Sequence, residues 1–332
     1  MRAAWWTIGG VLMLALACTP AAAPAPTAAP ATPAAAAKPS QGLRIGMIGV
    51  GSAVYAPVYA TQDRGLFAKN GISVELTDYN SGSAAQEALA AGDADIIHYF
   101  PGGVATAVSK GVKEKIIATD QFQPNEWHIV VSTISAIKGP PDLQGKKVGV
   151  TAKGSTTDFF ALWLMQKAGV TFDIVPVGNA ALYPSVTSGQ IDAAVLTPPL
   201  NMQGFENNEL RSVFDYAKEM DPSLPSVIVA SDKIIAEQPD AVTRYLKSLF
   251  QGVQYLKQNA DYCTSFVGKH TNQPASIATR ICTDVIAHYS DDGRIQQAWL
   301  DTSLNLSKLG GLNDTPPTDQ MYTEKFTPVK LD

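Results

Sequence analysis

Histidine and cysteine are scarce in this chain, with four histidines and three cysteines among 332 residues. None of them has the paired spacing of a zinc site, so we expect neither a metal centre nor a cofactor. The sequence also lacks the Gly-x-Ser-x-Gly, phosphate-loop and metalloprotease motifs that mark common enzymes. A net charge of −5 and the absence of a long basic run argue against nucleic-acid binding.

The N-terminal region is typical of an exported protein. The apolar run at residues 5–17 is too short to cross a bilayer comfortably but has the length of a signal-peptide core. Cys18 follows directly, at the position of the lipid acceptor in bacterial lipoproteins. We therefore interpret residues 1–18 as a signal peptide that ends at a lipidated Cys18, with an ordinary cleaved secretory signal as the alternative. Residues 19–42 are mostly Ala, Pro and Thr, which predicts an extended tether without a core.

One sequence pattern occurs twice in the remaining chain, and we call this repetition the internal echo. Residues 88–99 and 185–196 each end a helix on glycine and then place an aspartate before an apolar strand. These aspartates, Asp95 and Asp192, are 97 residues apart. The echo indicates two halves that share one architecture.

Strands and helices alternate in both halves. The predicted strands of the two halves are 43–50 and 73–79, then 147–151 and 172–177. Each half reads strand–helix–strand–helix–strand, which predicts an α/β fold with two lobes, each a mainly parallel sheet with helices on both faces. The rest of the chain predicts a returning strand, an amphipathic helix and two packing helices, at 225–235, 239–259, 274–289 and 294–308.

Ligands of such sheets bind beyond the carboxyl ends of the strands, so the loops there form a candidate cleft between the lobes. The candidate ligand-binding residues in or next to these loops are Gly51, Ser52, Tyr55, Ser81, Ser83, Tyr99, Phe100, Trp127, Ser155, Thr156, Asn179, Tyr183 and Thr197. Ser83 with Gln86, and Ser155 with Asp158, also fit helix capping boxes. Helix capping is therefore the alternative role of the serines, as core packing is for the aromatic residues.

Four stretches carry a resemblance to a known family: Ala-Pro at 56–57, RGLFAKNGI at 64–72, SGSAAQEALAAGDADI at 81–96 and DLQGKKVGV at 142–150. In combination they make the chain similar to the nitrate/sulfonate/taurine branch of ABC-transporter solute-binding proteins. The resemblance implies the type II periplasmic-binding fold, a two-lobed clamp that closes on a small ligand and docks on a membrane permease.

The resemblance also implies that the chain crosses twice between the lobes, near Val130 and Val227. Lobe I then comprises residues 43–130 and 228–332, and lobe II comprises residues 131–227. We expect a monomeric substrate-binding component of an ABC importer, held at the membrane through its lipid anchor and served by a permease and its ATPase. The alternatives are an enzyme on the same fold that makes pyrimidine or menaquinone precursors, and a tethered ligand sensor.

The cleft loops also constrain the ligand. Lys153 is the only lysine or arginine in these loops, whereas aromatic residues are common in and beside them. Helix N-termini can hold one weak anion, and flat side chains favour a ring. We expect a small organic solute with a ring, either mono-anionic or neutral, and we expect inorganic anions to be excluded.

The remaining cysteines predict a disulfide. Once Cys18 is lipidated, Cys263 and Cys282 are the only thiols left, and export places them in an oxidising compartment. Two free cysteines packed as small apolar residues are the alternative.

Replacing Cys18 with serine (Cys18→Ser) tests the anchor. Stable attachment to a membrane requires a multiply acylated cysteine, so the variant should move from the membrane fraction to the soluble fraction. Immunoblotting of the two fractions measures the change, with a Cys263→Ser variant as the control that keeps the anchor. A variant that stays in the membrane pellet would show that Cys18 is not the attachment point.

Overall fold

The computed structural model describes residues 41–49 and 52–332. The predicted signal peptide, Cys18, residues 19–40 of the predicted tether and Gly51 lie outside these residues. Residues 41 and 42 were also expected in the tether, but they form the start of the first strand. No helix in the described part of the chain has the length and hydropathy to cross a membrane.

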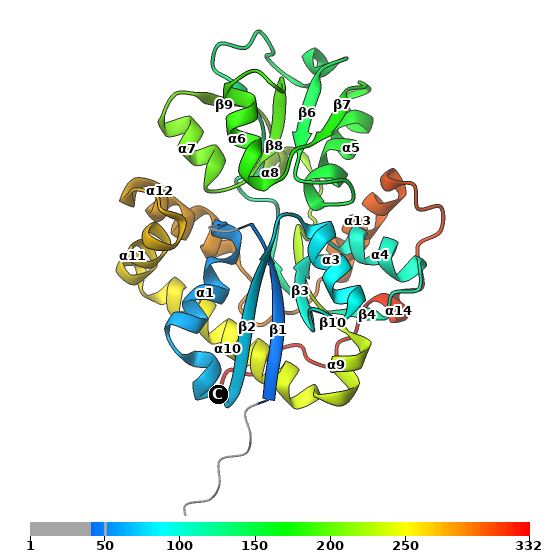
Figure 1. Cartoon of the computed structure of the whole chain (residues 1–332), viewed down its shortest axis with the longest axis vertical. Coiled ribbons are helices and arrows are strands. Elements are labelled where there is room, and N and C mark those ends of the chain that lie inside the picture. The colour runs from blue at the N-terminus through cyan, green and yellow to red at the C-terminus, as the bar shows by residue number, and fades with distance from the viewer. Residues whose placement is uncertain (1–40, 50–51) are drawn as a thin grey trace, which may run out of the picture. The chain divides into compact units, whose positions relative to one another are not determined.

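Two five-stranded sheets organise the fold, and both have the same strand order (Figure 1). The first sheet consists, in spatial order, of β2 (Ile72–Tyr79), β1 (Gln41–Ile48), β3 (Ile96–Tyr99), β10 (Ser226–Ser231) and β4 (Glu114–Gln121). The second consists of β7 (Asp173–Pro176), β6 (Lys147–Val150), β8 (Ala193–Leu196), β5 (His128–Ser132) and β9 (Leu210–Asp215).

One strand of each sheet is reversed. β10 is antiparallel to both of its neighbours in the first sheet, and β5 is antiparallel to both of its neighbours in the second. The other pairings are parallel, so four strands of each sheet share one direction. The predicted α/β class is confirmed, and the sheets are mixed because each receives one strand as the chain arrives from the other lobe.

These two reversed strands shift the expected lobe boundaries. All of His128–Ser132 pairs within the second sheet, and all of Ser226–Ser231 pairs within the first. The crossings therefore lie at residues 122–127 and 220–225, a few residues before the expected positions at Val130 and Val227. An apolar strand sequence does not reveal which of two sheets it joins, and this explains the error.

The echo of Asp95 and Asp192 has a structural cause. The Asp95 carboxylate accepts a hydrogen bond from the Arg44 backbone N–H at 2.9 Å, and the Asp192 carboxylate accepts one from the Lys147 backbone N–H at 2.8 Å. In each case the backbone N–H of the aspartate donates back to the carbonyl of the same basic residue. The repeated aspartate therefore joins β1 to the start of β3 in the first lobe and β6 to the start of β8 in the second.

Helices cover both sheets. Those of the first lobe are η1 (Ala53–Tyr55), α1 (Ala56–Asp63), α2 (Leu66–Lys69), α3 (Gly82–Ala91), α4 (Pro101–Ser109), α9 (Asp232–Glu237), α10 (Pro239–Gln258), α11 (Ala260–Thr271), α12 (Ala275–Arg280), α13 (Gln297–Asn305) and α14 (Thr318–Met321). Those of the second lobe are η2 (Pro140–Leu143), α5 (Thr156–Ala168), α6 (Asn179–Thr187), α7 (Leu200–Glu206) and α8 (Tyr216–Glu219). Short turns at η3 (Ile281–Val285), η4 (Ile286–His288) and η5 (Leu306–Gly310) complete the set.

The predictions for the C-terminal third differ from the structure in two places. The expected strand at 225–235 ends at Ser231, whose hydroxyl accepts the Ile234 N–H and thereby caps α9. The expected continuous helix at 274–289 is instead α12 followed by a π-helical turn and a 3-10 turn. The apolar face predicted for α10 is confirmed, since its members Val242, Tyr245, Leu246, Leu249 and Val253 are all buried.

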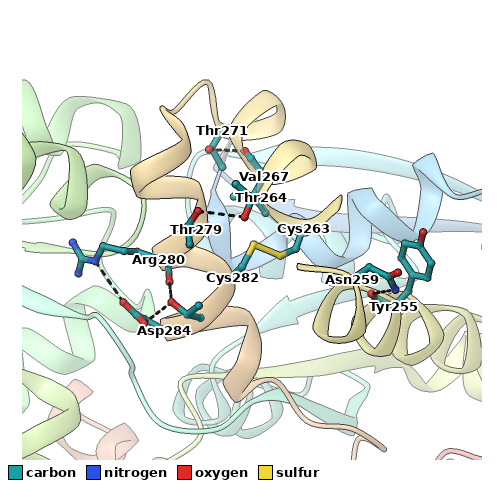
Figure 2. The surroundings of a disulfide bond; sticks show 11 residues. Tyr255, Asn259, Cys263, Thr264, Val267, Thr271, Thr279, Arg280, Cys282 and Asp284 are labelled. Carbon is teal, nitrogen blue, oxygen red and sulfur yellow. Dashed lines mark hydrogen bonds and ion pairs between the residues drawn. A yellow bond between two sulfur atoms is a disulfide. The ribbon is translucent and has the colours of Figure 1, made fainter. Parts of the chain in front are cut away.

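A disulfide joins Cys263 on α11 to Cys282 in the π-helical turn after α12 (Figure 2). Their Cα atoms are 6.1 Å apart, and Cys263 is buried. Beside it, the hydroxyl groups of Thr264 and Thr279 lie 3.3 Å apart and link the same two helices. The bridge therefore closes a helical hairpin on the flank of the first lobe.

Removing this bridge should destabilise the hairpin. The two cysteines are 19 residues apart, and a loop of that size corresponds to a stabilisation of about 3 kcal/mol on the chain-entropy model. A Cys263→Ser/Cys282→Ser double variant should lower the free energy of unfolding by this amount in urea titrations. Alkylation of the native wild type without reductant, followed by peptide mapping, is the control. Label on both Cys263 and Cys282 would contradict the bridge.

Candidate ligand-binding site

A cavity lies where the carboxyl ends of the forward strands of the two sheets meet. The first lobe and the two crossings contribute Ile48, Ser52, Val54, Tyr55, Gly82, Tyr99, Trp127, Pro225 and Ser226. The second lobe contributes Thr151, Ser155, Thr156, Thr157, Asn179, Leu182, Val195 and Thr197. Most of these residues follow a forward strand or precede a reversed one, which places them at the edge that faces the other lobe.

Hydroxyl groups dominate the second-lobe wall. The Thr151 hydroxyl donates to the Ser155 hydroxyl at 2.7 Å, and the Ser155 hydroxyl donates to the Ala152 carbonyl at 2.7 Å. The Thr157 hydroxyl accepts the Thr151 backbone N–H at 2.9 Å. This network fixes the start of α5, whose first-turn N–H groups supply partial positive charge at the cavity.

Trp127 ends the first crossing and closes one side of the cavity. Its side chain is only 7% exposed, and its ring packs on Phe160 with ring centroids 5.1 Å apart. The indole Nε1–H is buried and donates to no group among the described residues. Because this atom is closed off from the cavity, the indole limits the size of the cavity without offering it a donor.

Tyr99 closes the opposite side by joining the two lobes. Its hydroxyl donates to the Gly154 carbonyl at 2.6 Å. The ring lies in a slot between Gly82 on α3 and Gly103 on α4, where an added Cβ would approach the ring to 2.6 and 2.3 Å. Only glycine leaves room for the ring at these two positions. Burial raises the pKa of Tyr99, so its hydroxyl remains a proton donor.

Tyr99 also separates the cavity from a second pocket. That pocket is lined by Ser83, Glu87, Lys110, Lys153 and Gly154, among others. Lys153, the cation expected near the ligand, therefore lies on the far side of Tyr99. The prediction of a mono-anionic solute relied on Lys153, and Lys153 does not line the cavity.

Polar contacts hold the lobes together at the other end of the cleft. Gln273 Nε2 donates to Gln203 Oε1 of α7 at 3.3 Å, and the Ser276 hydroxyl donates to Glu206 of α7 at 2.8 Å. Together with the hydrogen bond between Tyr99 and Gly154, these contacts show that the two lobes touch on both sides of the cavity.

A buried polar cluster lies directly behind the first-lobe wall. His98 Nδ1 lies 2.5 Å from Asp120 Oδ2, and His98 Nε2 lies 2.9 Å from the Tyr245 hydroxyl. The Ser226 hydroxyl, which lines the cavity, donates to the same Asp120 oxygen at 3.1 Å. Burial, together with the charge of Asp120, raises the pKa of both Tyr55 and Tyr245.

The structure brings together most of the residues predicted to contact the ligand. Those that line the cavity are Ser52, Tyr55, Tyr99, Trp127, Ser155, Thr156, Asn179 and Thr197. Ser155 occupies the expected N-cap position directly before α5, but its side chain makes no capping hydrogen bond. Asp158, its expected capping partner, instead accepts the Gly154 N–H at 2.8 Å.

Four predicted residues lie away from the cavity. Ser81, not Ser83, caps α3 by accepting the Ala84 N–H at 3.2 Å, and Ser83 faces the second pocket. Phe100 is fully buried beside Phe159 and Phe160, because consecutive residues of an extended segment point to opposite sides and Tyr99 already takes the cavity side. Tyr183 lies in the second turn of α6, where its hydroxyl donates to Glu209.

Other lining residues were not anticipated. Pro225 and Ser226 stand before and at the start of a reversed strand, whereas the cleft loops were expected mainly at the carboxyl ends of forward strands. Thr151 and Thr157 stand within four residues of Ser155, so the hydroxyl-rich stretch around α5 was the available signal.

Comparisons with known proteins support the resemblance. A family model described as NMT1/THI5 like matches residues 52–262. A protein of Brucella abortus whose name describes a binding protein is 24% identical over 281 residues, which cover 80% of this chain and 85% of that protein. The taurine-binding periplasmic protein of Escherichia coli is 28% identical over 211 residues, which cover 62% of this chain and 64% of that protein.

Solved structures share the fold. The alkanesulfonate-binding protein SsuA from Xanthomonas axonopodis pv. citri, bound to MOPS, has a TM-score of 0.71 and 16% identity over 82% of this chain and 95% of that one. The desulfurization enzyme DSZB has a TM-score of 0.61 and 16% identity over 86% of this chain and 97% of that one. The predicted two-lobed periplasmic-binding fold is confirmed by these likenesses.

The bond between Tyr99 and Gly154 should control how often this side of the cleft opens. Tyr99→Phe removes the donor and leaves the Gly154 carbonyl unpaired, which costs about 1 kcal/mol and raises the open population about 5-fold. Amide hydrogen exchange of the 151–160 segment should accelerate accordingly. Tyr79→Phe is the matched control, because the Tyr79 hydroxyl makes no hydrogen bond among the described residues. Equal exchange in both variants would contradict this role.

Proposed function

The chain belongs to the NMT1/THI5-like family, and from this premise we propose that it is the solute-binding component of an ABC importer. It captures a small organic solute between its lobes and delivers it to a membrane permease that is driven by an ATPase. The names of its relatives, which include taurine- and sulfonate-binding proteins, support transport of small organic solutes.

One observation carries this proposal: the cavity offers unused hydrogen-bonding capacity in a site shared by both lobes. The hydroxyl groups of Thr156 and Thr197 line the cavity and make no hydrogen bond among the described residues, and Thr156 begins α5, whose first N–H groups have no helical partner. A solute that satisfies these groups also bridges the lobes, because Ser226 and Thr156 reach it from different lobes.

The same wall argues against catalysis by this chain. Apart from tyrosine, no described residue that lines the cavity has an ionisable side chain. The nearby His98 is 1% exposed, and both of its ring nitrogens have partners. General acid–base chemistry needs a titratable group within reach of the substrate, and tyrosines with raised pKa values are poor bases.

The proposal includes the position of the protein in the cell. An exported monomer held by a lipidated Cys18 and by the tether at residues 19–40 would capture solute beside the membrane that holds its permease. A sensor that reports to a membrane receptor would use the same cavity, and genes beside this one for a permease and an ATPase would favour transport.

Native mass spectrometry of protein purified without denaturation tests the proposal. Clamp proteins commonly retain their solute, so the wild type should carry one small molecule per chain. Trp127→Ala should lose it, because truncation of a buried binding anchor costs about 2–4 kcal/mol. Trp299→Ala is the matched control, since Trp299 packs against Phe122 and does not line the cavity. The proposal fails if the wild type carries no solute and binds none from a metabolite panel.

A further inference from the structure

One helix of the second lobe reaches into the apolar core of the first. Met202 of α7 is 0% exposed and belongs to a core cluster that includes residues of β1, α1 and α10. Every other described member of this cluster comes from the first lobe. The burial of Met202 therefore depends on contact between the lobes, because separation of α7 from the first lobe returns its side chain to water.

Polar contacts flank Met202 on the same helix. Asn201 Nδ2 donates to the Glu126 carbonyl at 2.7 Å, which ties the start of α7 to the first crossing. The hydrogen bonds of Gln203 and Glu206 described above tie the rest of α7 to the hairpin of α11 and α12, which lies below it in Figure 1. The helix thus meets the first lobe through one buried apolar side chain with hydrogen bonds around it.

A pocket of about 300 Å³ lies beside α7, and both lobes line it. The first lobe contributes Asn80, Thr271 and Gln273, among others, and the second lobe contributes Pro199 and Leu200 at the start of α7. We call this space the α7 pocket. Its position next to the helix means that movement of α7 changes its width.

The α7 pocket adjoins the cavity. Ser52, Asn179 and Thr197 line both spaces and therefore stand between them. The Asn179 side chain lies against the backbone of Gly49 in the other lobe, where an added Cβ would come within 2.6 Å of Asn179 Nδ2. A solute that moves from the α7 pocket into the cavity must displace this contact between the lobes.

The opposite end of the cleft is harder to open. Beside Tyr99 one apolar core cluster contains residues of both lobes, and these include Phe100 of the first lobe and Phe160 of the second. Separation there exposes several aromatic rings to water, whereas separation at α7 exposes one methionine of the second lobe. The lobes therefore part more readily at α7, next to the α7 pocket.

We propose that α7 is the gate of the cavity, and that solute passes through the α7 pocket when Met202 withdraws from the first lobe. The inference rests on the proposed function and names the helix that controls access to its site. Met202 is a positioning residue, since it does not line the cavity. The Thr197 carbonyl accepts the N–H groups of Leu200 and Asn201, so movement of α7 also moves a residue of the cavity wall.

Thiol labelling measures this motion without any solute. Met202→Cys places a thiol at the contact, where N-ethylmaleimide reaches it only after α7 has withdrawn. Met47→Cys is the matched control, because Met47 on β1 is also 0% exposed in the same core cluster but is buried within one lobe. We expect position 202 to be labelled at least about 10-fold faster than position 47, since local opening costs less free energy than global unfolding. Peptide mapping assigns the label.

Release of the co-purified solute measures the gate in function. Met202→Ala should accelerate release about 10-fold, because the closed state loses a buried apolar contact that the open state lacks. Native mass spectra recorded at intervals after dilution give the release rate. Met165→Ala is the control, since Met165 of the second lobe packs against the other core cluster.

A surface variant tests the gate if the variants at position 202 do not fold, as judged by circular dichroism. Gln273→Ala/Ser276→Ala removes the two hydrogen bonds between the hairpin and α7. Amide hydrogen exchange across residues 200–206 should then accelerate about 5-fold. Thr264→Ala removes a hydrogen bond of the same hairpin that does not reach α7, and it should leave this exchange unchanged.

The outcomes separate the two proposals. Equal labelling at positions 47 and 202, unchanged release from Met202→Ala, or unchanged exchange in the double variant would overturn the gate and leave the solute-binding function intact. Absence of any retained solute, together with no binding from a metabolite panel, would overturn the function, and the gate with it.

Discussion

The two crossings between the sheets are the constraint on which the rest of the molecule depends. Each crossing delivers one reversed strand, β5 into the second sheet and β10 into the first, so the first sheet is completed only after the chain has formed the whole second sheet. The same crossings supply Trp127 and Pro225 to the cavity wall, and Ser226 follows directly at the start of β10. The crossings act as the hinge between the lobes and also form part of the cavity wall. Contacts between a solute and these residues therefore depend on the angle between the lobes.

The cleft is held differently at its two ends. Beside Tyr99, Phe100 packs on Phe159 and Phe160, and the apolar core continues from one lobe into the other. At the other end Gln273 meets Gln203 of α7 through polar side chains, but Met202 of the same helix belongs to the apolar core of the first lobe. Separating the lobes therefore exposes apolar surface to water at both ends, and the one Met202 side chain exposes less of it than the aromatic rings beside Tyr99.

The hydrogen bonds that the cavity can offer to a solute depend on which of its polar groups already have partners within the protein. Hydroxyl groups around α5 use most of their protons within their own network, and Ser226 uses its proton on Asp120. What remains for a solute includes the N–H groups at the start of α5. No lysine, arginine or histidine among the described residues lines the cavity, so specificity depends on the direction of hydrogen bonds more than on ion pairing.

The sequence by itself determined the local architecture. Glycine-ended helices, apolar strands and the repeated aspartate gave the two α/β halves, and the spacing on α10 gave its buried face, because these depend on residues close in the chain. Tertiary structure decided the rest. Whether Tyr99 or Phe100 faces the cavity, that Lys153 lies beyond it, and that Asp120 stands behind Ser226 all depend on strand pairing between distant segments, which local patterns do not record.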